Sequence, residues 1–143
     1  MLIEHLTARR DPSDILTCAR AMPVRDAVAL LAGKRIGALP IVDGDEVVGI
    51  FSERDVIYRL ASEGAMCLDR PVGEVMTSPA ITVTPRDKID HALALMTKRR
   101  IRHLPVVSDD RLIGFVSIGD LVKSRFDEVE AEAQSMRAYI QTA

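Results

Sequence analysis

Residues 37–55 read GALPIVDGDEVVGIFSERD, and residues 102–120 read RHLPVVSDDRLIGFVSIGD. The second stretch matches the first at a constant offset of 65 residues, and no gap is needed from Ile15 to Arg125. Identical residues recur 65 positions on from Thr17, Ala27, Ala29, Leu30, Arg35, Ile36, Leu39, Pro40, Val42, Asp45, Gly49, Ser52 and Asp55. Two copies of one unit usually bury a shared face against each other, which creates two related clefts. The repeat therefore predicts that a binding site occurs as a pair.

The composition describes an ordinary globular domain with an aliphatic core. The 143 residues are 48% hydrophobic but only 3% aromatic, with no Trp, so the core must consist of Val, Ile, Leu, Ala and Met. A net charge of −2 gives no overall attraction to nucleic acid or to an anionic membrane. No apolar run approaches the roughly 18–20 residues that a membrane span needs. These features argue against nucleic-acid partners and membrane insertion.

Cysteine usage and missing motifs narrow the chemistry. Cys18 and Cys67 form no CxxC pair and have no His cluster beside them, which predicts a reduced, cytoplasmic protein with no metal site. The motifs GxSxG, GxxxxGK[ST], HExxH and GxGxxG are absent. This absence favours binding over catalysis, with an enzyme of unknown type as the alternative. The basic run 98–103 suggests a nucleic-acid patch, but cations at a helix end explain it equally well.

Each repeat has the pattern strand, helix, strand, strand, helix. In the second copy, 80–83 is predicted to be a strand, and Thr84 to cap a helix that begins at Pro85. The apolar face of that helix would consist of Ile89, Ala92, Leu93 and Met96. Strands over 103–107 and 111–117 then form a hairpin, as do their counterparts around the Asp43-Gly44-Asp45 turn.

The repeats divide the chain into five parts. An N-terminal segment (1–14) precedes the first repeat (15–64), a connector (65–79) containing one helical turn, the second repeat (80–126) and a C-terminal helix (127–143). The last part carries an apolar stripe at helical spacing, which consists of Val129, Ala133, Met136 and Ile140. We expect this stripe to pack on the body of the protein or on a second subunit.

Ser-x-x-Asp occurs twice in register, as Ser52 to Asp55 and as Ser117 to Asp120. The pattern is typical of a capping box at the start of a helix, which is a purely structural role. The same position also suits a ligand, because a helix N-terminus attracts anions and an Asp can accept ribose hydroxyls. Gly49 and Gly114, which precede the two Ser residues, are predicted to let a ligand approach the backbone.

The two copies differ at the residues where the first strand of each predicted hairpin begins. The first copy has Gly37-Ala38, whereas the second has Arg102-His103. A guanidinium beside an imidazole near a helix N-terminus is a reasonable phosphate clamp, although both could equally be exposed polar residues at a strand start. The first alternative predicts that one cleft discriminates by phosphate more strongly than the other.

The LPIV and LPVV stretches (39–42 and 104–107), each followed by G-h-h-S-x-x-D with h apolar, resemble a tandem CBS-domain (Bateman) module over 15–125. More narrowly, the chain is similar to small stand-alone bacterial CBS-pair proteins. The resemblance implies an α/β (α+β) fold of two β-α-β-β-α repeats packed sheet to sheet with pseudo-twofold symmetry. It also implies a disc-shaped homodimer and clefts that bind adenosine-containing ligands.

The resemblance also assigns residues to two pockets, each of which mixes both copies. The first pocket would consist of Ser52, Asp55, Ala80, Ile81, Ile101, Arg102 and His103. The second would consist of Ser117, Asp120, Ile15, Leu16, Ile36, Gly37 and Ala38. The second pocket has no basic pair at Gly37-Ala38, so a phosphate there would need a cation from elsewhere, such as Arg10 or a dimer mate.

The resulting hypothesis is a non-catalytic regulatory sensor of adenine nucleotides. AMP is the first choice of ligand, followed by ATP or NAD(H), and no cofactor is required. Occupancy would change the shape of the homodimer or its affinity for an unidentified regulated protein. The alternatives are a sensor of NAD(H) or S-adenosylmethionine, and a ligand-free structural interaction protein whose Ser52 and Ser117 act only as helix caps.

Overall fold

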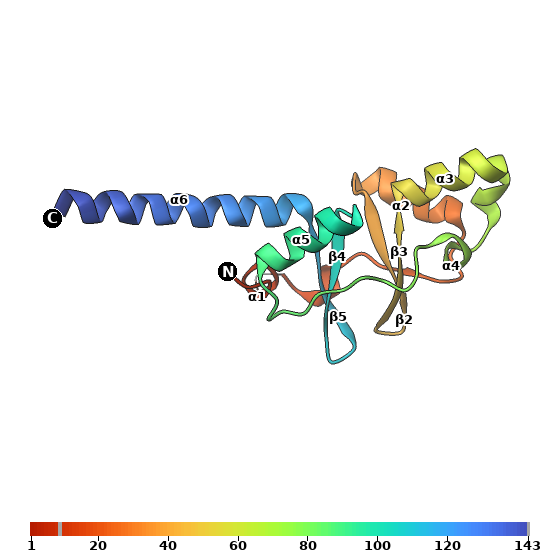
Figure 1. Cartoon of the computed structure of the whole chain (residues 1–143). Helices are drawn as coiled ribbons and strands as arrows, with labels where there is room; N and C mark the ends of the chain where they lie inside the picture. The colour runs from red at the N-terminus through yellow and green to blue at the C-terminus, as the bar shows by residue number, and fades with distance from the viewer. Residues whose placement is uncertain (9, 143) are drawn as a thin grey trace.

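The computed structural model describes residues 1–8 and 10–142, and Figure 1 shows two similar units and a long C-terminal helix. The first unit consists of β1 (Cys18–Ala19), α2 (Val24–Lys34), β2 (Ala38–Asp43), β3 (Glu46–Ser52) and α3 (Glu53–Glu63). The second consists of α5 (Ile89–Arg99), β4 (His103–Ser108), β5 (Arg111–Ser117) and α6 (Ile118–Thr142). Two short helices, α1 (Glu4–Thr7) and η1 (Pro12–Asp14), precede the first unit, and two more, η2 (Gly64–Asp69) and α4 (Val72–Val75), lie between the units.

The two hairpins confirm the predicted repeat in register. Strands β2 and β3 are antiparallel with Ala38 opposite Ser52, and β4 and β5 repeat this with His103 opposite Ser117. A register shift occurs at the same place in both hairpins, after Ile41 and after Val106. The two units therefore share local irregularities as well as sequence.

The start of the second repeat differs from the prediction. The first repeat has a short parallel strand, β1, whereas the expected strand over 80–83 is reduced to one bridge between Val83 and Val106. Thr84 does not cap a helix, because its backbone N–H donates to Asp87 Oδ2 in a turn and α5 begins only at Ile89. The N-terminal segment occupies this stretch: the N–H of Ile3 donates to the Asp87 carbonyl.

Each unit is completed by a segment that precedes the other unit. The core of the second unit includes Ile3, which is fully buried beside Val83, Ile89 and Leu104. The core of the first unit includes connector residues Val72 and Val75. The sequence analysis assigned no core residues to the N-terminal segment or to the connector, yet both supply them.

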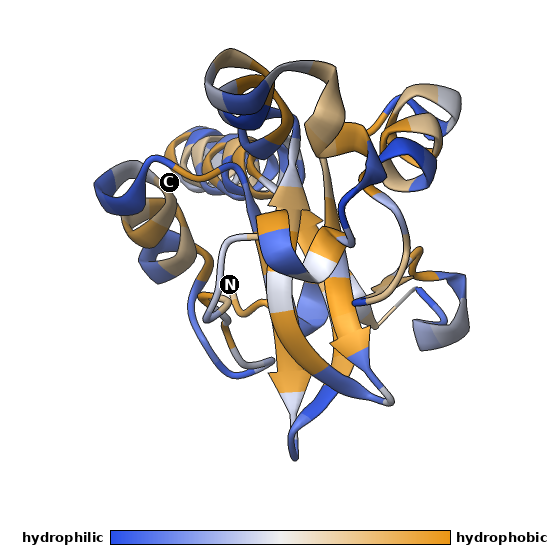
Figure 2. Ribbon diagram, turned by 90° about the vertical axis from the view of Figure 1, so that its right-hand side faces the viewer, coloured by the Kyte–Doolittle hydropathy of each residue, from blue (hydrophilic) through white to orange (hydrophobic). Residues whose placement is uncertain are grey.

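The sheets of the two units face each other, as Figure 2 shows by the apolar strands at the centre of the molecule. At the hairpin tips, the Leu112 N–H donates to the Asp45 carbonyl over 3.1 Å, and Arg111 lies 3.9 Å from the Asp45 carboxylate. The helices lie outside the sheets, so the ends of the strands and the starts of α3 and α6 are brought together between the units.

Helix α6 is continuous from Ile118 to Thr142, so the second helix of the repeat and the expected C-terminal helix are one element. Its outer part extends away from the body in Figure 1, and its apolar side chains there are exposed. The alternative that the stripe packs on the body is therefore wrong. Within residues 1–8 and 10–142, no helix is both long and apolar enough to cross a membrane.

Candidate functional site

The two Ser-x-x-Asp elements form the same reciprocal structure at the starts of α3 and α6. The Ser52 N–H donates to Asp55 Oδ2 over 2.8 Å, and the Asp55 N–H returns a bond to Ser52 Oγ over 3.4 Å. At α6 the Ser117 N–H donates to Asp120 Oδ2 over 2.9 Å, and the Asp120 N–H donates to Ser117 Oγ over 3.1 Å. The capping role is therefore real in both copies, and each carboxylate is held in one orientation.

The second oxygen of each carboxylate has a different partner in the two copies. Asp55 Oδ1 accepts from the Thr77 hydroxyl over 2.9 Å. Asp120 Oδ1 accepts instead from the Arg10 guanidinium over 3.3 Å. A carboxylate has about four lone-pair sites, so both Asp side chains keep acceptor capacity for a further donor such as a ribose hydroxyl. All four groups lie at the edge of a cleft.

The first cleft has a volume of about 250 Å³ and includes all seven residues that the sequence assigned to it. Ser52 and Asp55 come from the start of α3, while Ala80, Ile81, Ile101, Arg102 and His103 come from the second unit. Arg100, which lies between α5 and β4, has a left-handed backbone conformation with φ 55°. The Arg54 guanidinium donates to the Arg100 carbonyl over 2.7 Å, which ties the two units together at the cleft.

The second cleft has a volume of about 650 Å³ and includes six of its seven assigned residues. Those six residues are Ile15, Leu16, Ile36, Ala38, Ser117 and Asp120. Gly37 lies on the first cleft instead, whereas Ala38 and His103 line both. Arg10 and Lys34 also line the second cleft, so it has the basic groups that Gly37-Ala38 cannot provide.

The asymmetry between Gly37-Ala38 and Arg102-His103 has a steric cause. A Cβ at Gly37 would lie 3.2 Å from His103 Cε1 and 3.5 Å from Glu53 Oε1. The imidazole of one copy therefore occupies the space that a side chain at position 37 of the other would need. Near the pseudo-twofold axis a large residue in one copy requires a small one in the other, because both fill the same volume.

His103 lies between the clefts rather than only in the first. Its ring stacks on Phe115, with the ring centroids 5.5 Å apart and the planes 14° apart. Burial lowers the pKa of His103, the nearby Arg102 charge lowers it further, and Asp120 and Glu53 act in the opposite direction. Burial and Arg102 thus favour the neutral imidazole, and Arg102 is the charged member of the expected phosphate clamp.

The two glycines before the Ser residues are both required by the packing of the chain, and they differ in their relation to the clefts: Gly114 lines the second cleft, whereas Gly49 lines neither. A Cβ at Gly49 would lie 2.5 Å from Met76 Sδ and 2.9 Å from the Thr77 carbonyl oxygen. A Cβ at Gly114 would lie 2.5 Å from Thr7 Cγ2. Each glycine therefore admits the segment that completes its unit.

Several lining residues were missed by the sequence analysis. In the first cleft they include Glu53, Arg54, Tyr58, Thr77 and Arg100, and in the second Thr7, Asp11, Asp14, Lys34 and Phe115. Thr77 lies in the connector, outside the repeat. Arg10, which the sequence analysis named as a possible cation for the second cleft, does line that cleft.

The arrangement suits a ligand that is apolar on one side, hydroxylated in the middle and anionic at one end. Ala80, Ile81 and Ile101 offer apolar surface to a flat base, and a carboxylate offers acceptors to vicinal hydroxyls. Arg54, Arg100 and Arg102 can pair with phosphate oxygens. Among the described residues, no group of three or more His, Cys, Asp or Glu side chains could hold a metal ion.

Comparison with known proteins identifies the family that the repeated motifs resemble. A CBS-domain profile matches residues 9–62 and 72–127. The chain is 40% identical over 131 residues to the CBS domain-containing protein CBSX3, mitochondrial, of Arabidopsis thaliana, covering 88% of this chain and 64% of that protein. It is 28% identical to the CBS domain-containing protein YhcV of Bacillus subtilis, and the match covers 83% of this chain and 84% of that protein.

Solved structures match the fold closely. The CBS-domain protein ATU1752 of Agrobacterium tumefaciens superposes with a TM-score of 0.81 at 33% identity, covering 87% of this chain and 99% of that one. The CBS domain pair of MJ0100, solved with 5′-methylthioadenosine and S-adenosyl-L-methionine, superposes with a TM-score of 0.76 at 26% identity. That match covers 90% of this chain and 98% of that one. CBSX2, solved with AMP, shares the fold with a TM-score of 0.74 at 24% identity, covering 88% of this chain and 96% of that one.

Proposed function

Because this chain belongs to the CBS-domain family, we propose that it is a non-catalytic sensor that binds an adenine nucleotide in each of its two clefts, with AMP as the preferred ligand. The observation that carries the proposal is the pair of carboxylates, Asp55 and Asp120. Both are fixed at a helix start by a reciprocal bond to Ser, and both face a cleft between the units. Solved CBS pairs that hold 5′-methylthioadenosine, S-adenosylmethionine or AMP support an adenosine-containing ligand.

Each part of the nucleotide has a matching group in the first cleft. The base would lie against Ile81 and Ile101, the ribose hydroxyls would donate to Asp55, and the phosphate would lie near Ser52 and Arg102. The exposed N–H groups at the start of α3 add attraction for the anion. In the second cleft, Asp120 takes the part of Asp55, and Arg10 takes the phosphate.

Signalling would act through a homodimer and a separate regulated protein in the cytoplasm. Cys18 and Cys67 are both free and buried, which agrees with a reducing compartment. Helices α3 and α6 begin at the ribose carboxylates, so ligand contacts act directly on two outer helices. A change in the position of these helices would alter the surface seen by a second protein.

A longer dinucleotide such as NAD(H) is a second candidate for the larger cleft. That cleft has about 650 Å³ against about 250 Å³ for the first, and its cations Arg10 and Lys34 come from separate segments. Two cations on separate segments can contact a diphosphate without closing the end of the cleft.

Calorimetric titration of the full-length protein with AMP, ATP, NADH and S-adenosylmethionine tests the proposal. We expect AMP to bind tightest, with two sites per chain. Tighter binding of NADH at one site would assign the second cleft to a dinucleotide. Failure of all four compounds to bind at millimolar concentration would overturn the sensor and leave a structural interaction protein.

A further inference from the structure

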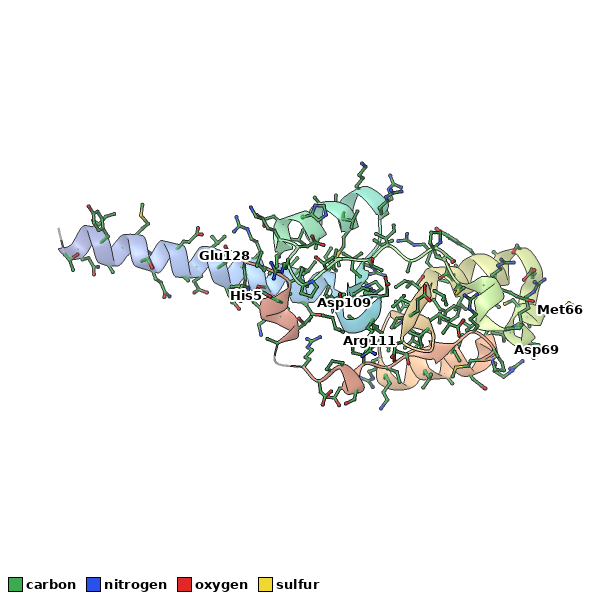
Figure 3. All side chains as sticks on the ribbon, turned by 90° about the horizontal axis from the view of Figure 1, so that it is seen from below. His5, Met66, Asp69, Asp109, Arg111 and Glu128 are labelled. Atoms are coloured by element: carbon green, nitrogen blue, oxygen red, sulfur yellow. The ribbon has the colours of Figure 1, made fainter. Side chains whose placement is uncertain are left out.

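The projecting part of α6 carries a regular apolar seam that the nucleotide clefts do not use. Beyond Glu128, which Figure 3 shows where the helix leaves the body, the helix extends alone. Apolar residues recur alternately four and three positions apart, at Val122, Phe126, Val129, Ala133, Met136 and Ile140. This is the a and d spacing of a heptad repeat, with Phe126, Ala133 and Ile140 at a and Val122, Val129 and Met136 at d.

The seam lies on a different face from the one that packs on the body. Leu121 and Ser124 are buried, and Arg125 pairs with Asp90 of α5 over 3.4 Å, so this side of the helix faces the second unit. The seam residues are exposed, with relative exposures of 52% for Val122, 67% for Phe126, 48% for Val129, 64% for Met136 and 69% for Ile140. A helix of this kind is stabilised mainly by covering its apolar face.

The charged residues beside the seam identify what covers it. Heptad positions g and e flank the seam. Arg125, Glu132 and Tyr139 lie at g, and Lys123, Glu130 and Arg137 lie at e. In a parallel pair of identical helices, each g residue meets the e residue five positions further along the second copy. Glu132 then faces Arg137, which is an attractive contact. Arg125, which also pairs with Asp90 and Glu128 of its own chain, lies on the side of Glu130, so no like charges meet there.

The antiparallel arrangement brings like charges together. When two copies of 122–140 overlap fully in opposite directions, g residues meet g residues and e residues meet e residues. Glu132 then faces Glu132, and Glu130 faces Glu130, at the middle of the overlap. Like charges across a coiled coil are unfavourable and set the orientation of the partner.

We propose that residues 122–140 of two copies of this chain form a parallel, in-register, two-stranded coiled coil. This inference goes beyond the nucleotide-binding proposal and does not depend on it. It predicts that the C-terminal ends of the two chains lie side by side and that the seam is a site of self-association. The small Ala133 at a central a position leaves this contact weak, so the association depends on protein concentration.

A gain of affinity tests the seam without risk of unfolding. Ala133→Ile places a preferred residue at the central a position, and the control Ala131→Ile makes the same change at the exposed f position of the same helix. By sedimentation equilibrium of the full-length protein, we expect Ala133→Ile to tighten dimerisation at least tenfold and Ala131→Ile to change it less than twofold. Equal effects of the two variants, or no effect of either, would overturn the seam.

Charge exchange tests the parallel orientation. Glu132→Arg and Arg137→Glu should each weaken dimerisation several-fold, because each leaves two like charges facing one another. The double variant restores an opposite pair in the parallel arrangement and should recover the affinity of the parent. Single variants without effect, or a double variant weaker than both singles, would rule out the parallel, in-register pairing.

Discussion

The two clefts have the same helix start, but the Asp carboxylate of that helix start has a different partner in each cleft. In the first cleft Asp55 is held by the neutral hydroxyl of Thr77, whereas in the second Asp120 is held by the cation Arg10. Thr77 belongs to the connector and Arg10 to the N-terminal segment. Duplication of the unit therefore reproduced the group that would bind ribose, while the segments outside the repeat determine the charge around it.

The clefts also differ because they share a wall. His103 and Ala38 line both clefts, and the ring of His103 occupies the space above Gly37. A residue that enlarges one copy at this point must reduce the other. The first cleft is consequently smaller and has an arginine at the strand start, while the second is larger and takes its cations from Arg10 and Lys34. The two copies cannot both carry a large side chain at this shared wall.

The largest effect on the comparison should come from removing each carboxylate in turn. Asp55→Ala should weaken AMP binding at the first cleft about ten- to hundredfold, since a hydrogen bond to a charged group contributes about 1.5–3 kcal/mol. Asp120→Ala should do the same at the second cleft only. Calorimetry of each variant should show one class of site lost or weakened and the other retained.

These Asp residues also bond to the backbone at a helix start, so the experiment needs a variant that loses an equivalent carboxylate-to-backbone bond but no cleft residue. Asp87→Ala provides it, because Asp87 Oδ2 accepts from the Thr84 N–H over 2.8 Å in a turn before α5, and Asp87 lines neither cleft. Loss of such a hydrogen bond costs about 1 kcal/mol of stability, which thermal unfolding measures separately. AMP binding weakened equally in Asp87→Ala and Asp55→Ala would assign the effect to stability and not to ribose recognition.

A smaller effect on AMP affinity should come from removing Arg10 from the second cleft or Arg102 from the first. In the Asp55→Ala background, where the second cleft is read alone, Arg10→Ala should weaken AMP about fivefold, because a partly exposed ion pair contributes about 1 kcal/mol. Adenosine, which carries no phosphate, should bind as before or more tightly, because Asp120 loses a competing partner. Arg102→Ala in the Asp120→Ala background should give the same contrast at the first cleft.

Two controls test whether the loss of AMP affinity comes from an ion pair: the salt concentration and a variant of an arginine outside the clefts. The difference between AMP and adenosine should shrink as salt is added, because exposed charge pairs are screened. Arg25→Ala removes an exposed arginine that pairs with Asp69 over 3.4 Å outside both clefts, and it should change neither affinity. Equal losses for AMP and adenosine in Arg10→Ala would mean that Arg10 only orients Asp120.

Most of the fold was predictable because the repeat restricts both copies at once. The hairpins, the helix starts at Ser52 and Ser117, and the apolar face of α5 follow from local patterns that occur twice. The start of the second repeat was not predictable from such patterns. Thr84-Pro85 has a strong cap signal, but the backbone groups of Pro85 and Asp87 bond to the N-terminal segment, and α5 begins later.

The candidate site was predictable where it lies within the repeat and not where it depends on tertiary contact. The resemblance assigned fourteen residues, and thirteen lie on the cleft expected for them, with Gly37 on the other. Thr77 gave no sequence signal, because a threonine in a connector has no periodic partner. The role of Gly49 was misjudged for the same reason, since its neighbour Met76 comes from a different segment.

The smallest expected effect is on the pH dependence of stability, and it comes from His103, which lines both clefts. Because burial and Arg102 lower the pKa of His103, the unfolded chain takes up a proton at that residue before the folded chain does. Stability should therefore fall as pH drops through about 6.5, the ordinary value for histidine, and no loss should arise from this residue above it. His103→Gln should remove this part of the loss, whereas His91→Gln, at an exposed position on α5, should retain it. Urea unfolding at pH 7.5, 6.5 and 5.5 measures the difference. If His103→Gln loses as much stability as the parent between pH 6.5 and 5.5, the imidazole takes up its proton equally in the folded and unfolded chains, and the lowered pKa is wrong. A greater loss in His103→Gln than in the parent would mean that the folded chain holds the charged imidazole, which would then belong to the phosphate clamp together with Arg102.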